Sequence, residues 1–315
     1  MKHHRIPGTE LKLSALCLGT SAFGTRLKGE EADRVVGTFL EAGGTFFDTA
    51  HCYSFWEPNG LGASERELGA CLRRLGVLDK VVIGTKGGHP DGGAAYPRPD
   101  RYLAPEVIAT DVAESLERLQ VARIGLYFLH RDDPRVPVDE ILDALNTEVC
   151  RGRIRYLGAS NWSVARLQEA NACALQWGWQ GFVISQVQWS LAVPNWAPGP
   201  DPVMRFVSDE DAAWYAAAGL PVVAYSASAC GYFADERSGA PTFDSPTNHE
   251  RRARARELAS QLGCTPVQVA LAYLMHQDSR VIPAFSTSNV EHLAEVLGSL
   301  AVTLSPAQVR WLREG

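Results

Sequence analysis

Hydrophobic positions along the chain form short apolar runs, and longer stretches with helical spacing separate them. The runs are rich in valine, isoleucine and phenylalanine, which is typical of buried strands. They cover residues 13–18, 45–49, 81–85, 125–129, 156–159, 183–187, 221–224 and 281–284. Eight strands that alternate with helices predict an α/β protein with a closed (β/α)8 barrel of the TIM type. We also expect a short β-hairpin at the N-terminus.

Local signals mark where several of the helices begin. A serine followed three residues later by glutamate or glutamine predicts a capping box, in which the side chains satisfy free amide groups of the first turn. Such boxes are expected at Ser64, Ser288 and Ser305, and Thr265 precedes a proline that suits a first helical position.

An open doubly wound sheet is the alternative arrangement for alternating strands and helices. Its glycine-rich fingerprint, G-x-G-x-x-G, does not follow the first strand, and the nearest string, at residues 60–65, ends in glutamate. A dinucleotide would therefore bind at the carboxyl ends of the barrel strands.

Size and composition agree with one barrel. The chain has 315 residues, of which 46% are hydrophobic and 21% charged, so we expect a single domain spanning residues 1–315. A net charge of −6 disfavours nucleic acid as a partner. The basic run at residues 251–256 is expected to be a solvated helix face.

Targeting signals and cysteine usage point to a cytoplasmic protein. The N-terminus has no apolar signal core, and no stretch approaches the about 20 apolar residues that cross a bilayer. The seven cysteines show no C-x-x-C spacing and are expected to be reduced thiols. No membrane partner is expected, and the oligomeric state stays open.

Polar residues stand where three neighbouring strands end, the place where barrels carry their chemistry. They are Asp48, Lys86 and His130, and Tyr53 lies five residues after Asp48. Carbonyl reduction needs an acid beside the reacting oxygen. Tyr53 suits that role if a lysine ammonium makes its phenolate accessible, and Asp48 would offset the desolvation of Lys86. His130 would donate a hydrogen bond to the substrate oxygen.

Long irregular stretches at residues 54–63 and 191–207 follow the second and sixth strands, and loops of this length often shape binding sites. Trp56 lies in the first loop, and Trp162 follows the fifth strand. Both are predicted to line the substrate pocket, because an indole offers a flat apolar face.

Ordered motifs across nearly the whole chain resemble those of the aldo-keto reductase family. The strings are FFDTAHCY at 46–53, GTK at 84–86, LHRDDP at 129–134, YLGASN at 156–161, SQVQ at 185–188, AYS at 224–226 and VIP at 281–283. The resemblance implies an NAD(P)(H)-dependent oxidoreductase acting on a small carbonyl or alcohol. It also implies that Asp48, Tyr53, Lys86 and His130 form the catalytic tetrad.

The resemblance implies a nicotinamide site as well. Ser160, Asn161 and Gln186 would bind the carboxamide, Tyr225 would stack on the ring, and Ser226 and Ser228 would lie near the pyrophosphate. Hydroxyl and amide groups match the donors and acceptors of a carboxamide.

The segment that would meet the 2′-phosphate of NADP(H) spans residues 283–292. It contains Ser286, Ser288 and His292 as candidate contacts but no lysine or arginine. A phosphate favours guanidinium or ammonium partners, so the cofactor is expected to be NADP(H) or NAD(H), with the preference open.

Two other functions stay open at this point. A nucleotide-binding regulatory protein with slow turnover would keep the same residues, and a Schiff-base aldolase would use Lys86 as its imine-forming amine. No catalytic metal site is predicted, because the first strand carries no histidine pair.

Overall fold

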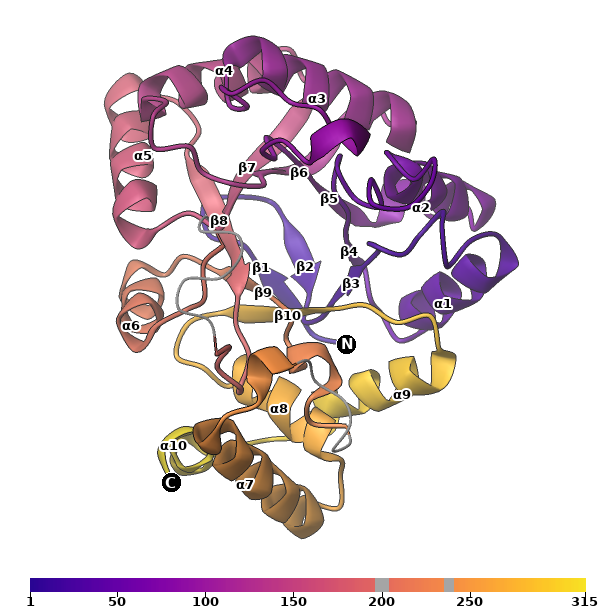
Figure 1. Cartoon of the computed structure of the whole chain (residues 1–315), viewed down its shortest axis with the longest axis vertical. Helices are drawn as coiled ribbons and strands as arrows, with labels where there is room; N and C mark the ends of the chain where they lie inside the picture. The colour runs from indigo at the N-terminus through magenta and orange to yellow at the C-terminus, as the bar shows by residue number, and fades with distance from the viewer. Residues whose placement is uncertain (196–203, 235–240) are drawn as a thin grey trace.

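The computed structural model describes residues 1–195, 204–234 and 241–315. Eight parallel strands close into a barrel in the order β10-β3-β4-β5-β6-β7-β8-β9 (Figure 1). The predicted (β/α)8 barrel is therefore confirmed. The strands are β3 (Cys17–Gly19), β4 (Phe46–Asp48), β5 (Val82–Gly87), β6 (Ile124–Leu129), β7 (Ile154–Ser160), β8 (Phe182–Gln188), β9 (Val222–Tyr225) and β10 (Val281–Phe285).

Helices surround the barrel and bury their apolar faces against it (Figure 1). They are α1 (Glu30–Glu41), α2 (Ala63–Arg74), α3 (Pro105–Leu119), α4 (Val138–Cys150), α5 (Val164–Trp177), α6 (Asp209–Ala218), α7 (Pro246–Leu262), α8 (Pro266–Met275), α9 (Val290–Gly298) and α10 (Pro306–Glu314). In Figure 1, α7 and α10 lie beyond α8, at the edge of the molecule.

An N-terminal hairpin closes the end of the barrel from which the strands start. Strands β1 (His3–Arg5) and β2 (Lys12–Ser14) pair antiparallel, which confirms the expected hairpin. Ile6, Leu11 and Leu13 are buried in a cluster with interior barrel residues such as Phe128. The predicted first strand at residues 13–18 was wrong in its bounds. It joins the end of β2 to β3, because both segments are buried and read as one apolar run.

Two of the four predicted helix starts are confirmed. Ser305 and Thr265 form capping boxes with Gln308 and Gln268. The box at Ser64 is wrong: its hydroxyl instead donates to the carbonyl oxygen of Thr20. The box at Ser288 is also wrong, since Asn289 caps α9 by accepting from the amide of Glu291.

The basic run at 251–256 is not simply a solvated face. Arg251 donates to the carbonyl oxygen of Arg313, and Arg254 donates to that of Leu312. Guanidinium groups at the carboxyl end of a helix donate hydrogen bonds to its free carbonyl oxygens and interact favourably with the negative end of its dipole. The run thus anchors α10 to α7.

Within the described ranges, no single helix combines the length and apolarity needed to cross a membrane. Helices α7 and α8 meet those two criteria only as a pair bent by 98°.

Candidate active site

A cavity of about 460 Å³ opens at the carboxyl ends of the barrel strands. We call it the mouth cavity. Seven strands or the turns after them contribute to its lining, which is why residues far apart in sequence meet here. Of the predicted site residues it is lined by Asp48, Tyr53, His130, Ser160, Asn161, Gln186, Tyr225, Ser226, Ser228 and Ser286.

Lys86 lies beneath this cavity and is 1% exposed. Its Nζ donates to Asp48 Oδ2 at 2.7 Å, to the carbonyl oxygen of Thr49 at 2.8 Å and to Tyr53 Oη at 2.9 Å. An ammonium has three N–H donors and no acceptor. Three acceptors therefore hold Lys86 as a fixed cation, aimed at both the carboxylate and the phenol.

Neighbouring strands position this group. Strands β4 and β5 pair with Asp48 opposite Gly84, two residues before Lys86. On the other side, Gln186 of β8 donates from Nε2 to Asp48 Oδ1 at 2.8 Å. The buried carboxylate thus has a partner on each oxygen, as a buried charge requires.

Burial raises the pKa of Tyr53 well above its usual value, and the Asp48 carboxylate raises it further. Lys86 acts in the opposite sense, because an ammonium 2.9 Å from Tyr53 Oη favours the phenolate. At neutral pH Tyr53 is therefore a phenol that can give up a proton to a stronger base.

His130 is held as a neutral imidazole. Burial lowers its pKa well below the usual value, and the charge of Arg131 lowers it further. Its Nδ1 lies 3.4 Å from Cys52 Sγ, and burial raises the pKa of that thiol to about 12. In the tautomer whose ring proton lies on Nε2, the protonated thiol donates to Nδ1.

The opposite side of the cavity is a network of neutral polar groups. Asn161 Oδ1 accepts from Tyr225 Oη at 2.7 Å, and Asn161 Nδ2 donates to Ser160 Oγ at 3.0 Å and to the carbonyl oxygen of His130 at 3.2 Å. These groups offer amide and hydroxyl partners beside an aromatic ring.

Residues with left-handed backbone follow both β7 and β9 at the cavity wall. Ser226 has a φ of 52° and Asn161 a φ of 62°, a left-handed conformation that is costly for serine and cheaper for asparagine. Both lie on the cavity wall, as does Ser228. Strain of this kind is common where a backbone is shaped for a ligand.

The segment after β10 contributes only in part. Ser286 lines the cavity and donates to the carbonyl oxygen of Gly19 at 2.8 Å. A side chain at Gly19 would come within 2.8 Å of Ser286 Oγ, so a larger residue there would displace the Ser286 hydroxyl. Ser288 and His292 are exposed and lie outside the cavity lining.

Neither predicted pocket tryptophan lies on the cavity wall. Trp162 is 1% exposed and packs edge-on against Phe182, with ring centroids 5.0 Å apart. It belongs to the main hydrophobic core, so the prediction that it lines the substrate pocket was wrong. Trp56 is 51% exposed and contacts Phe55. Of the second loop, residues 196–203 lie outside the described residues.

Sequence reasoning missed three residues near the site. Arg131 lines the cavity, and its place directly after His130 was the only available signal. Cys52 and His89 adjoin His130, but they follow different strands, so their spacing gave no motif.

The chain is similar to known proteins along nearly its whole length. The model described as the aldo/keto reductase family matches residues 15–314. The uncharacterized oxidoreductase YrpG of Bacillus subtilis (strain 168) is 30% identical and aligns over 100% of this chain and 95% of its own length. The probable aldo-keto reductase 1 of Glycine max is 29% identical over 96% of this chain and 84% of its own.

A solved structure has the same fold. The thermostable aldo-keto reductase Tm1743, in complex with the inhibitor epalrestat, superposes with a TM-score of 0.74 over 99% of both chains. Its sequence is 24% identical, so the likeness is one of architecture.

Proposed function

The chain belongs to the aldo/keto reductase family, and from that premise we propose that it is a single-domain enzyme that interconverts a carbonyl compound and an alcohol with a nicotinamide cofactor. One observation carries the proposal. Lys86 bridges Asp48 and Tyr53 beneath the mouth cavity, with all three of its donors engaged.

Tyr53 is proposed as the proton donor to the substrate oxygen. Its phenol is protonated at neutral pH, which suits an acid in the direction of reduction. As the proton leaves, negative charge develops on Oη, and the ammonium 2.9 Å away stabilises that charge. Asp48 keeps the ammonium in place, so it acts through Lys86.

His130 is proposed to orient the carbonyl. With the S–H of Cys52 donating to Nδ1, Nε2 would carry the proton and donate to the substrate oxygen. A neutral imidazole polarises the carbonyl without competing with Tyr53 for the role of acid.

The neutral side of the cavity fits a nicotinamide. Ser160, Asn161 and Gln186 supply amide and hydroxyl partners for a carboxamide, and the Tyr225 ring supplies a stacking face. When bound, the nicotinamide would supply the hydride. Ser226, Ser228 and Ser286 would hold the rest of the nucleotide through hydroxyl and backbone groups.

A Schiff-base aldolase is disfavoured. An imine-forming lysine must be a free, neutral amine, whereas Lys86 has three acceptors within 2.9 Å. Freeing it would leave the buried Asp48 carboxylate without its cation.

Substitution of Tyr53 by phenylalanine tests the assignment. Tyr53→Phe removes only the hydroxyl, so turnover with a model aldehyde should fall at least about 100-fold, while nucleotide affinity stays near that of the unmodified protein. Tyr156→Phe is the matched control, because Tyr156 Oη accepts from the amide of Glu10 at the hairpin end of the barrel. Near-normal turnover of Tyr53→Phe would exclude Tyr53 as the acid.

Quenching of tryptophan emission by NADPH and by NADH measures the affinity of the protein for each cofactor. Residues 284–292 contain no lysine or arginine, which favours comparable binding of the two over a strong preference for NADPH. Tight binding with negligible turnover of several aldehydes would instead support a regulatory nucleotide-binding protein. Binding of neither would overturn the proposal.

A further inference from the structure

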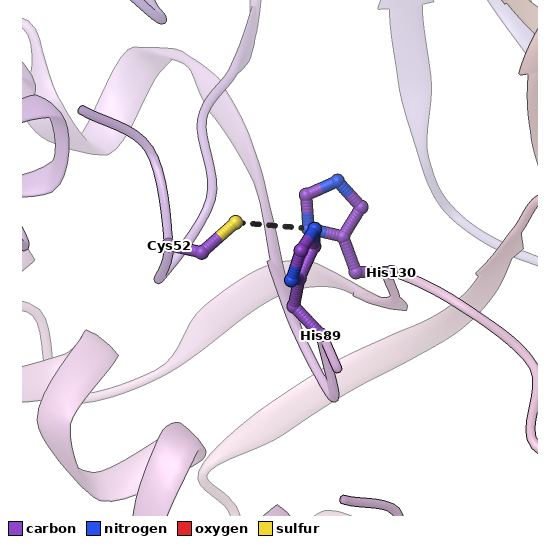
Figure 2. A group of neighbouring side chains, drawn as sticks. All are labelled: Cys52, His89 and His130. Carbon is purple, nitrogen blue, oxygen red and sulfur yellow. Dashed lines mark hydrogen bonds between the residues drawn. The ribbon is translucent and has the colours of Figure 1, made fainter. Parts of the chain in front are cut away.

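Three metal-binding side chains meet beside the mouth cavity: Cys52, His89 and His130. They follow β4, β5 and β6, so three adjacent strand ends bring them together. One ligand atom from each lies within 4.8 Å of the other two. Figure 2 shows the Cys52 thiol pointing at His130, with the His89 ring beside that contact.

The distances suit a small soft cation. With metal–sulfur and metal–nitrogen bonds of about 2.3 and 2.0 Å, neighbouring ligands of a tetrahedral Zn²⁺ stand about 3.5 Å apart. Cys52 Sγ and His130 Nδ1 are already 3.4 Å apart. A cation between them would take the place of the proton that they share.

His89 is oriented to serve as the third ligand. Its Nδ1 lies 2.8 Å from the carbonyl oxygen of Pro90, and a carbonyl only accepts, so Nδ1 carries the proton and Nε2 the lone pair. A backbone carbonyl on the distal nitrogen is the usual support of a zinc-binding histidine. The ring also packs 4.9 Å from that of His130.

We propose that Cys52, His89 and His130 form an inhibitory site for Zn²⁺. One thiolate and two imidazoles are the donor set of zinc rather than of magnesium or calcium. The inhibitory role rests on the proposed function, because His130 is the residue that would orient the carbonyl. The site differs from a catalytic metal centre in that the cation removes a catalytic group from use.

Movement of the His130 ring on binding the cation would cause the inhibition. Drawing ligand atoms that are up to 4.8 Å apart to tetrahedral distances shifts the imidazoles by as much as about 1 Å, and a misplacement of that size can cost about 100-fold in rate. The cation would also replace the contact with Cys52 that now fixes the His130 ring.

Titration of the full chain with Co²⁺, in a non-chelating buffer, tests binding without any need for activity. We expect one Co²⁺ per chain, with a thiolate-to-cobalt charge-transfer band that Zn²⁺ displaces and Mg²⁺ does not. Cys52→Ser should abolish the band, and His89→Phe, which keeps the ring packing, should weaken binding at least about tenfold. Cys150→Ser, which removes an exposed cysteine, should leave the spectrum unchanged. An unaltered band in Cys52→Ser would overturn the site.

Turnover measured with and without Zn²⁺ tests the inhibitory role. Each variant is compared with itself: Zn²⁺ should slow the unmodified protein and Cys150→Ser at least about tenfold and should have little effect on His89→Phe. Stoichiometric binding with undiminished turnover would overturn the inhibition. Absence of turnover before Zn²⁺ is added contradicts the proposed function instead, and the cobalt spectrum then still decides whether the site exists.

Discussion

The two sides of the mouth cavity are built on different principles. One side, which we call the charged half, comprises Asp48, Tyr53, Lys86 and His130 from β4 to β6. The other, the neutral half, comprises Ser160, Asn161, Gln186, Tyr225, Ser226, Ser228 and Ser286 from β7 to β10. Among the described residues lining the neutral half, none carries a formal charge.

The contrast separates two tasks. A buried ion pair is strongly directional and costly to break, so the charged half suits the movement of a proton at one fixed point. Neutral hydrogen bonds exchange partners at little cost, so the neutral half suits a ligand that must enter and leave. Changes in the charged half should therefore alter turnover, and those in the neutral half should alter affinity.

The largest effect is expected from Lys86→Met. Loss of the ammonium should reduce turnover by about 10²- to 10⁴-fold and destabilise the fold by about 3–5 kcal/mol, because the buried Asp48 carboxylate loses its cation. Steady-state kinetics and chemical denaturation measure the two effects. Lys80→Met changes an exposed lysine and should alter neither turnover nor the stability of the fold. Unchanged stability would mean that the pair contributes no net free energy.

A smaller effect, on affinity alone, is expected from Tyr225→Ala. Loss of the ring should weaken nucleotide binding by up to about tenfold, the value of one aromatic contact, while turnover at saturating nucleotide stays nearly constant. Tyr225→Phe keeps the ring and loses only the hydrogen bond to Asn161, so its affinity should fall less. A fall in saturated turnover comparable to that of Tyr53→Phe would erase the distinction between the halves.

His292→Arg should sharpen the contrast by adding a charge to the exposed first turn of α9, the helix that follows β10. A guanidinium near the start of α9 should strengthen NADPH binding by about tenfold, through one charge-assisted contact with the 2′-phosphate, and leave NADH unaffected. Ala294→Arg places the same charge two residues farther along α9 and controls for net charge. Equal gains in both variants would place the phosphate elsewhere.

No effect at all is expected from pH over a wide range. Burial lowers the pKa of His130 and raises that of Tyr53. The neutral imidazole therefore persists below its usual pKa of about 6.5, and the phenol above its usual pKa of about 10. The kcat/KM for reduction should stay flat between these values in buffers of constant ionic strength. A midpoint near neutral pH would show that one group titrates with an unshifted pKa.

The order of strands could be predicted because each barrel strand is a buried run with its own helix to follow. The predicted bounds of a strand were wrong where tertiary contacts decide them. Residues 13–18, for example, run from the hairpin strand β2 into the barrel strand β3. A capping box was predictable where the serine or threonine side chain bonds only within its own helix. The contacts of Ser64 could not be predicted in this way, because its hydroxyl bonds to Thr20 and Thr49, which follow β3 and β4.

Residues of the charged half could be named from the sequence because each ends a strand. Their protonation could not, since the rise in the pKa of Tyr53 comes chiefly from burial, which the folded structure decides. Trp162 was misjudged for a related reason: its position near a strand end is right for a pocket, but its side chain packs against Phe182. Position along a strand does not fix the direction of the side chain that follows it.

The hairpin has a consequence for the route by which ligands approach. With Ile6, Leu11 and Leu13 packed against interior barrel residues at one end of the barrel, a ligand of the mouth cavity would arrive and depart at the opposite end, where the strands terminate.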